Sequence, residues 1–216
     1  PIKNESPEVA EHFRRFAGSG ESELIVADGG GGPATSQRFQ EIGARLVHAD
    51  LPRGARLARA AREARGEILF FLHADSVPPD NALDAIREAL ANGAAAGAFS
   101  LAYQGFDARL RWIAWWANLR SRLLGLPFGD QGLFCRRDAY DRAGGFSSLP
   151  VCDDVDLVRR LKRSGRLVIR PERTRTSPRR YRERGALRQV LRHWRVLAGY
   201  FAGVSPEKLE RWYNGK

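Results

Sequence analysis

The sequence contains no methionine and opens on Pro1-Ile2, so either an initiator residue was removed or residues upstream are missing. No apolar run approaches the ~20 residues that a membrane-spanning helix requires, and no signal-peptide pattern opens the chain. The two cysteines, Cys135 and Cys152, fit neither a CxxC motif nor a disulfide framework. We therefore expect free, buried thiols, as in a protein of the reducing cytoplasm.

The sequence also lacks the two common phosphate-binding fingerprints. Four glycines, Gly29–Gly32, follow a short apolar stretch, but they include no lysine and do not have the GxGxxG spacing. This excludes a P-loop and a dinucleotide fingerprint there. No internal repeat or low-complexity linker interrupts the chain, and 43% hydrophobic with 28% charged residues indicates a folded domain rather than a disordered chain.

The net charge is strongly positive, at +11. A basic surface suits nucleic acid, an anionic membrane surface or a phosphorylated substrate equally well. Charge alone therefore indicates an anionic partner without choosing among the three.

The stretch Glu67–Asp75 organises the predicted fold. Its five consecutive apolar residues, 68–72, are too few for a helix and predict a strand buried on both faces, as in parallel sheets covered by helices. Ligands of such sheets bind beyond the carboxyl ends of the strands, where His73 and Asp75 fall. Asp75 is placed there either to hold a divalent cation with a phosphate-bearing substrate or to cap the following turn, and the stretch alone does not decide.

Strands and helices alternate along the chain, which predicts an α/β fold with right-handed crossovers and a mostly parallel sheet flanked by helices. Further strands are expected at residues 24–27, 45–48, 97–103 and 167–169 and directly after Gly132, and helices at 7–17, 35–43, 53–65, 81–91, 109–124, 153–163 and 186–201. The strand at 97–103 alternates like a half-exposed one.

Asp28 ends the strand before the glycine run, much as Asp75 ends the central one. Gly29 and Gly30 would let the backbone approach a phosphate or a base, although a flexible loop is the simpler interpretation. The helix at 53–65 is rich in arginine, and most of these side chains are expected to form a solvated face. Arg53 and Arg56 are exceptions, because they lie near the helix N-terminus, where phosphate binding is favoured.

The middle of the chain is rich in aromatic residues. Trp112, Trp115 and Trp116 have the i, i+3, i+4 spacing of a core stripe, so we expect packing inside rather than an exposed platform. The polar pair Asp130-Gln131 lies between two glycines, in a loop of the kind that often contacts a ligand.

Two acidic residues, Asp153 and Asp154, open the helix at 153–163, where the helix dipole favours their ionised forms. Such caps are common, so position alone favours a structural role. The helix at 186–201 carries arginines and aromatic residues. We expect it either to clamp phosphate or contact a membrane surface, or to pack on the domain with a solvated basic face.

Five motifs follow one another in an order and spacing that resemble family 2 glycosyltransferases of the GT-A fold. They are Pro1-x-x-Asn4-Glu5, Val26–Gly30, Leu72–Asp75 in the place of the DxD motif, Gly129–Gly132, and Cys152–Leu157 in the place of the E-D-x-D-L block. The resemblance spans nearly the whole chain, but the first strand of that fold, which would precede Pro1, is missing. The combination of HAD, GDQG and DDVDL resembles in particular a bacterial branch of glycosyltransferases associated with radical-SAM proteins.

The resemblance implies one GT-A domain over residues 1–216, with a nucleotide-sugar-binding half at 1–100, an acceptor-side half at 101–170 and a basic helical extension at 171–216. It also implies a metal-dependent, inverting enzyme of the hexosyltransferase class, which moves a sugar from a nucleotide-sugar donor to an acceptor hydroxyl. Asp75 and His73 would bind Mg²⁺ or Mn²⁺. The imidazole stands where the family has an aspartate and favours Mn²⁺.

The resemblance further assigns roles to individual residues. Asp154 would be the general base, with Asp153 as the competing candidate. The donor would be bound by Pro1, Asn4, Glu5, Asp28, Gly29, Gly30, Arg53, Arg56, His73, Ala74, Asp75, Arg179 and Arg180, of which the last two replace the arginine of an absent QxxRW motif. The acceptor would be bound by Gly129, Asp130 and Gln131.

Two other functions stay open at this point. A nucleotidyltransferase acting on a sugar phosphate has a similar nucleotide-binding half, but its glycine-rich loop with arginine and lysine is absent near the N-terminus. A nonenzymatic basic module explains the charge but not the carboxylates at strand ends, which would repel phosphate. Nucleic acid is therefore not expected as a partner. A lipid-linked acceptor, peripheral membrane contact of a cytoplasmic protein through the C-terminal helix, and a homodimer are all compatible with the sequence.

Overall fold

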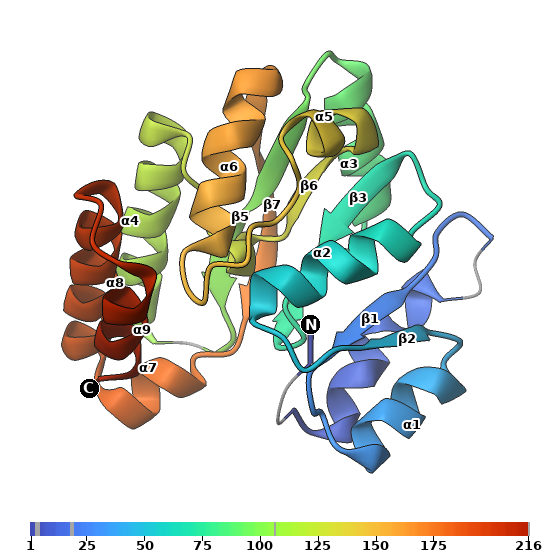
Figure 1. Cartoon of the computed structure of the whole chain (residues 1–216), viewed down its shortest axis with the longest axis horizontal. Helices are drawn as coiled ribbons and strands as arrows, with labels where there is room; N and C mark the ends of the chain where they lie inside the picture. Colours follow the sequence, from blue (N-terminus) through green and yellow to red (C-terminus); the bar gives the residue numbers. More distant parts are fainter. Residues whose placement is uncertain (3–4, 18–19, 106, 216) are drawn as a thin grey trace.

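The computed structural model describes residues 1–2, 5–17, 20–105 and 107–215, apart from the side chains of Arg180 and Arg184 (Figure 1). The strands are β1 Ile25–Asp28, β2 Arg45–His48, β3 Ile68–Phe71, β4 Ser76–Val77, β5 Ala96–Tyr103, β6 Leu133–Arg136 and β7 Leu167–Thr176. The helices are α1 Pro33–Glu41, α2 Arg53–Glu63, α3 Ala82–Ala91, α4 Ala108–Leu124, α5 Arg137–Arg142, α6 Asp153–Ser164, α7 Arg179–Arg184, α8 Ala186–Phe201 and α9 Pro206–Asn214, with 3-10 helices η1 Pro7–Phe16 and η2 Gly129–Gln131.

The predicted α/β architecture is confirmed, but the larger sheet is mixed rather than mostly parallel. The strands β1 and β2 pair in parallel, and five others follow the order β3-β6-β5-β7-β4. Within this sheet β5 and β7 are parallel, whereas β6 runs antiparallel to both β3 and β5, and β4 runs antiparallel to β7. The apolar pattern marks a strand without giving its direction, so β6 could not be recognised as reversed.

The strand β3 lies at the end of the five-stranded sheet, and it is not buried on both faces as predicted. Leu69 is buried, but Ile68 is 38% exposed. An apolar cavity of about 410 Å³ separates β3 from β1 and is lined by side chains such as Val26 and Phe70. The N–H of Ile2 donates to the Ala27 carbonyl at 2.9 Å, so the start of the chain lies beside β1.

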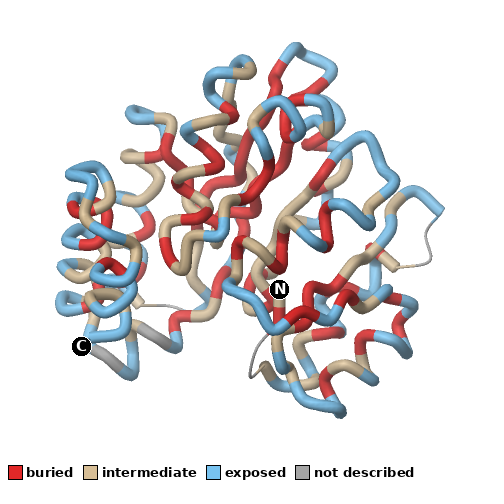
Figure 2. Tube along the Cα trace, viewed as in Figure 1, coloured by how far each residue is buried: buried red, intermediate tan, exposed pale blue. Residues whose placement is uncertain are grey.

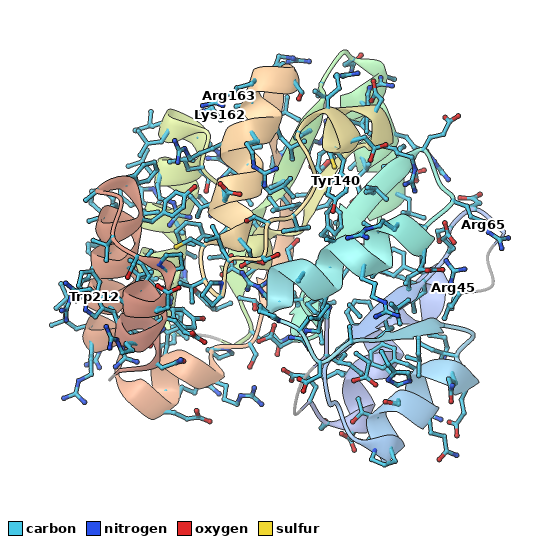
Figure 3. All side chains as sticks on the ribbon, viewed as in Figure 1. Arg45, Arg65, Tyr140, Lys162, Arg163 and Trp212 are labelled. Carbon is cyan, nitrogen blue, oxygen red and sulfur yellow. The ribbon has the colours of Figure 1, made fainter. Side chains whose placement is uncertain are left out.

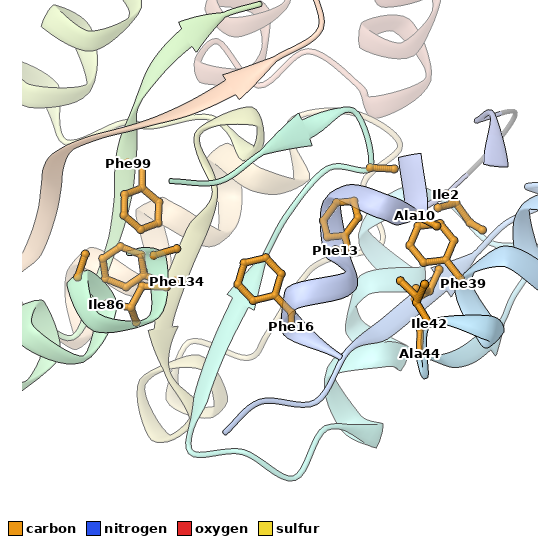
Figure 4. Close-up of a cluster of buried hydrophobic side chains, with 14 of the residues drawn as sticks. Ile2, Ala10, Phe13, Phe16, Phe39, Ile42, Ala44, Ile86, Phe99 and Phe134 are labelled. Carbon is orange, nitrogen blue, oxygen red and sulfur yellow. The ribbon is translucent and has the colours of Figure 1, made fainter. Parts of the chain in front are cut away.

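The core is densest around β5 and β6, and Figure 2 shows this buried centre. Six of the eight residues of β5 are buried, because β5 lies between β6 and β7; the predicted half-exposed strand is therefore wrong. The rings of Phe99 and Phe134 pack against each other at a tilt, and Phe13 and Phe16 of η1 extend the same cluster toward Phe39 (Figure 4). Burying an aromatic or large aliphatic side chain contributes roughly 1.5–3 kcal/mol.

The prediction that the tryptophans of α4 belong to the core is also wrong. Trp112, Trp115 and Trp116 are 62%, 55% and 46% exposed, because α4 packs on the sheet through its opposite side, with Leu110 and Ala114 buried. Helical spacing identifies a stripe but not which side of the helix faces the core.

The C-terminal helices pack back on the domain. Val196 of α8 packs with Leu209 of α9, and Leu197 joins a cluster with Val158 of α6. In the described part of the chain, no helix has the length and apolar character needed to cross a bilayer. The two cysteines are free, as predicted, but only Cys135 is buried; Cys152 is partly exposed.

Candidate active site

A cleft of about 430 Å³ opens where the N-terminus of α2, the end of β3, η2 and the N-terminus of α6 converge, facing the C-terminal helices. Charged and titratable side chains gather in it from four separate stretches of the chain: Arg53, His73, Asp75, Asp130 and Asp154. The structure therefore brings together most of the groups that the sequence motifs predict.

Arg53 and Asp153 form a partly buried ion pair beside the cleft. The Asp153 carboxylate is fully buried and accepts from the Arg53 guanidinium at 2.5 and 3.1 Å. Burial opposes the charge on Arg53, but the carboxylates of Asp153 and Asp154 outweigh it and raise the pKa of Arg53. A Cβ at Gly54 would lie 2.9 Å from that of Asp153, so this glycine lets α2 approach α6 closely.

Asp154, the next residue, faces the cleft and keeps 14% of its side chain exposed. Its Oδ2 accepts from the Gly129 N–H at 2.7 Å, and its Oδ1 accepts from the Val155 N–H at 2.8 Å. The position that a Cβ of residue 129 would occupy lies 2.7 Å from His73 Nε2 and 3.2 Å from Asp154 Oδ2. A side chain at this position would therefore push against His73 and crowd Asp154.

The carboxyl group of Asp130 is strongly affected by burial in the cleft. Burial, reinforced by the charges of Asp154 and Asp75, raises its pKa to about 6, although Arg120 and Arg53 oppose the shift. Its Oδ1 is buried and has no hydrogen-bond partner among the described residues. A buried carboxylate oxygen without a partner is costly unless a cation or a donor occupies the cleft beside it.

Two further titratable side chains, Asp75 and His73, line the cleft. Asp75 lines the cleft close enough to Asp130 for its charge to raise that pKa. His73 Nε2 lies 3.2 Å from Arg53 Nη1, so this nitrogen faces a cation already. Among the described residues no three His, Cys, Asp or Glu side chains are arranged to hold a metal ion. Asp75 and Asp130 both line the cleft and carry the carboxylate oxygens that a hard divalent cation prefers. The predicted role of His73 as a metal ligand stays a prediction.

Asp28, in contrast, does not line this cleft. Its Oδ1 accepts from the N–H groups of Gly30 and Gly31, and its Oδ2 accepts from Ser36 Oγ and lies 3.0 Å from His48 Nδ1. Burial raises the pKa of the carboxyl, but these hydrogen bonds outweigh burial and lower the pKa below its ordinary value. Asp28 thus fixes the turn between β1 and α1, and its predicted contact with the donor stays a prediction.

Two glycines of the run, Gly29 and Gly31, are approached closely by other side chains, whereas Gly30 and Gly32 border open space. A Cβ at Gly29 would overlap the Arg56 side chain, and one at Gly31 would lie 2.6 Å from the Ile2 side chain. Arg56 is buried and donates to the Ile2 carbonyl at 3.0 Å. Gly29 therefore leaves room for the Arg56 side chain, which lines the cleft.

The remaining predicted donor residues are placed as follows. Pro1, Glu5 and Ala74 line the cleft. Arg179 is half exposed and does not line the cleft itself, but it lies 3.8 Å from the carboxylate of Glu5, which does. Asn4 and the side chain of Arg180 lie outside the described residues.

The structure does not support the prediction that the Gln131 side chain contacts the acceptor. The side chain is fully buried, its Oε1 accepts from Ser121 Oγ at 2.8 Å and its Nε2 donates to the Phe99 carbonyl at 2.9 Å. Gln131 therefore anchors η2 to α4 and β5, and so positions Asp130 at the cleft. A glycine-flanked polar pair does not reveal which of its two side chains points inward.

Sequence reasoning missed the aromatic wall of the cleft. Tyr103 and Tyr181 meet edge to face at 5.2 Å between ring centroids, and His193 stacks on Tyr213. Gln189 contacts His193 at 2.7 Å and its buried Oε1 has no hydrogen-bond partner within the described chain. These residues come from four separate elements, β5, α7, α8 and α9, and no local sequence pattern spans all four.

This architecture is similar to that of known proteins. The family model for glycosyl transferase family 2 matches residues 1–148. The chain is similar to the mannosyltransferase PcManGT from Pyrobaculum calidifontis, solved in complex with GDP-Man and Mn²⁺, with a TM-score of 0.69 and 20% identity over 95% of this chain and 63% of that one. Among the curated proteins, none matches this chain.

A second similar structure is glucosyl-3-phosphoglycerate synthase from Mycobacterium tuberculosis, in complex with Mn²⁺, uridine diphosphate and phosphoglyceric acid. Its TM-score is 0.58, with 21% identity over 89% of this chain and 74% of that one. At such identities the likeness establishes the fold, which is the GT-A fold that the motifs predict. This chain spans less than two thirds of the mannosyltransferase.

Proposed function

The chain belongs to glycosyl transferase family 2, and on that premise we propose that it moves a sugar from a nucleoside-diphosphate sugar to an acceptor hydroxyl, with inversion at the anomeric carbon. The observation that carries the proposal is the cleft in which Arg53, Asp75, Asp130 and Asp154 meet. It combines a cation for the diphosphate, carboxylates for a metal ion and an accessible base.

Asp154 is the proposed general base. Of the two acidic residues that open α6, Asp153 is fully buried and held by Arg53, whereas Asp154 faces the cleft. Asp154 takes the proton of the acceptor hydroxyl while that oxygen bonds to the anomeric carbon. The bond from that carbon to the diphosphate breaks at the same time, and the electron pair leaves with the nucleoside diphosphate. One displacement of this kind inverts the anomeric configuration.

Arg53 and Arg56 are the proposed diphosphate contacts. Both line the cleft at the N-terminal end of α2, where unpaired backbone N–H groups also favour an anion. Asp153 has a positioning role, because its bidentate contact fixes the direction of the Arg53 guanidinium. Arg179 remains a proposed outer contact.

Asp75 and Asp130 would hold Mg²⁺ or Mn²⁺, which fits the unpartnered Oδ1 of Asp130. The bound cation would neutralise the charge that builds on the departing nucleoside diphosphate. His73 would then act through Arg53, which it contacts, rather than as a ligand. The two similar structures contain Mn²⁺, which supports a divalent cation for this chain too.

Two finer assignments belong to the same proposal. The motifs HAD, GDQG and DDVDL support a place in the branch associated with radical-SAM proteins. The family match favours a transferase over a nucleotidyltransferase or a nonenzymatic module. Release of nucleoside diphosphate rather than pyrophosphate distinguishes the first two.

The test is a thermal-shift screen of UDP, GDP and their common sugar conjugates, each with and without Mn²⁺, followed by measurement of nucleoside diphosphate release. We expect one nucleotide to stabilise the protein, and to do so only with the cation. If no nucleoside diphosphate shifts the melting temperature with Mn²⁺ or Mg²⁺, the assigned donor is wrong.

A further inference from the structure

Most of the large apolar side chains exposed in the described part of the chain lie on two helices. Of eleven such side chains, nine belong to α4 and α8: Trp112, Trp115, Trp116, Leu123, Leu124, Leu187, Leu191, Trp194 and Phe201. We call this set the α4–α8 surface. Exposed apolar residues that occur singly are ordinary, but a concentration on two elements marks a surface with a partner.

Each helix is apolar on two opposite sides. In α8, Gln189, Val196 and Leu197 face the domain and are buried. At 100° per residue, Leu187, Leu191, Trp194 and Phe201 fall on the other side as one stripe. In α4 the indole of Trp116 packs edge to face against both Trp112 and Trp115 on the outer side. The packing of the monomer uses only the inner side of each helix.

Both helices carry basic residues and no acidic ones. Residues 108–124 include four arginines and residues 186–201 include three, with no Asp or Glu in either range. Arg109, Arg111 and Arg122 of α4 and Arg188 and Arg195 of α8 are exposed. At the end of α4, Lys162 donates from Nζ to the Leu124 carbonyl at 2.7 Å and adds a further positive charge (Figure 3).

The two helices lie at the same end of the molecule, away from β1 and β2 (Figure 1). Leu126, two residues after α4, packs in the same apolar cluster as Leu197 of α8. The exposed stripes therefore belong to one end of the protein rather than to two unrelated sites.

We propose that the α4–α8 surface docks on an anionic lipid bilayer. Tryptophan, leucine and phenylalanine side chains enter the boundary between headgroups and acyl chains, and the flanking arginines contact lipid phosphates. Tryptophan suits this position because its large ring is apolar and its N–H still finds a polar partner.

The charges on the α4–α8 surface favour binding to an anionic bilayer over binding to a second copy of the chain. Two copies that met through the same faces would place arginines against arginines, and neither helix offers an acid to pair with them. The leucines select lipid over nucleic acid, because bases stack on aromatic rings and gain little from exposed leucines.

Docking would place the cleft next to the membrane. Gln189, His193 and Leu197 line the cleft from the inner side of α8, whose outer side carries the exposed stripe. One helix thus separates the reaction site from the proposed lipid surface. The docking itself does not depend on the proposed transferase activity and can be measured without substrate.

The test is sedimentation of the protein with vesicles of phosphatidylcholine alone and with vesicles that also contain phosphatidylglycerol. We expect binding to the anionic vesicles, with a blue shift of tryptophan emission. The double variants Trp115→Ser/Trp116→Ser and Leu187→Ser/Leu191→Ser should each lower the vesicle partition coefficient about tenfold or more, because each removes apolar area from the bilayer contact. Leu51→Ser is the matched control, because Leu51 is exposed and apolar but lies elsewhere.

A charge-reversed variant, Arg109→Glu/Arg111→Glu, tests the electrostatic half and leaves the apolar stripe intact; it should weaken binding to anionic vesicles by a similar factor. All variants should melt at the wild-type temperature, since the changed side chains are exposed. The proposal is overturned if the protein ignores anionic vesicles, or if its binding survives both apolar variants unchanged. A solution dimer that both apolar variants convert to monomer would also overturn it.

Discussion

The turn after β1 and the cleft at the start of α6 both contain a carboxylate that accepts two backbone N–H groups, yet the two are suited to different tasks. In the turn, Asp28 uses both oxygens on Gly30, Gly31, Ser36 and His48. In the cleft, Asp154 accepts from two N–H groups but still borders open space beside Arg53. A carboxylate saturated by its own loop shapes the backbone, whereas one that keeps access to a cleft can react.

The partners also differ in sequence distance. Three of the four contacts of Asp28 lie within eight residues of it, so the turn is assembled locally. The cleft joins Gly129 to Asp154 across 25 residues and Arg53 to Asp153 across 100. Contacts between residues close in sequence stabilise a turn on their own. Contacts between residues far apart in sequence form only when the whole domain has folded, and they can then bring groups of different chemistry together.

The largest effect is expected from Asp154→Asn. An amide cannot take the acceptor proton at neutral pH, so turnover should fall by about 10²–10⁴-fold. Binding of the donor and the melting temperature should change little, because the amide oxygen can still accept one of the two backbone hydrogen bonds. Single-turnover release of nucleoside diphosphate, compared with the nucleotide-induced thermal shift, separates these effects.

Asp153→Asn is the matched change at the neighbouring residue, and it should act on stability. It leaves the Arg53 guanidinium without its bidentate partner, which costs on the order of 3 kcal/mol because the Asp153 side of the pair is fully buried. Urea unfolding measures the loss. The assignment of the base would be reversed if Asp153→Asn stopped turnover in a stable protein and Asp154→Asn remained active.

Asp75→Asn should remove the dependence on the metal ion. A ligand at a hundred times its dissociation constant stabilises a protein by about 2.7 kcal/mol, so the shift in melting temperature with Mn²⁺ and nucleoside diphosphate should largely disappear. Asp84→Asn, which changes an exposed carboxylate on α3, should keep the shift. A full shift in Asp75→Asn would place the cation elsewhere in the cleft.

The sequence predicts these elements and carboxylates better than it predicts their surroundings. Strand-end position and a motif both indicated Asp75, whereas the role of Asp154 came from the family resemblance alone, because its place at a helix start favours a structural cap. The short helices α5 and α9 were missed, although Ser205 and Pro206 give α9 an N-terminal signal. The reversed direction of β6 and the cavity beside β3 depend on tertiary packing, which leaves no local trace.

Side-chain direction is the other feature that local pattern does not determine. Asp130 and Gln131 are neighbours in one loop, yet the first lines the cleft and the second is fully buried. Likewise the tryptophans of α4 have the spacing of a core stripe and are exposed, because the opposite side of the helix packs on the sheet. In each case the same sequence pattern is compatible with a buried side chain and with an exposed one, and only the tertiary packing decides between them.

The smallest effect is expected from Asp28→Asn, which tests the role of the turn after β1. The carboxylate is buried and its hydrogen bonds lower its pKa below the ordinary 3.8, so its ionised form is favoured by folding. The stability that the Asp28 carboxylate contributes is therefore present above the unfolded-state pKa and is lost as the pH falls through the folded-state pKa.

Asp28→Asn should lower the free energy of unfolding by about 1–2 kcal/mol at neutral pH, and its difference from the wild type should shrink below about pH 4. Urea unfolding across this pH range measures the difference, with Asp84→Asn as an exposed carboxylate whose removal should have little effect at any pH. A stable Asp28→Asn protein that fails to bind nucleotide would instead make Asp28 a donor contact, and the turn and the cleft would then belong to one site.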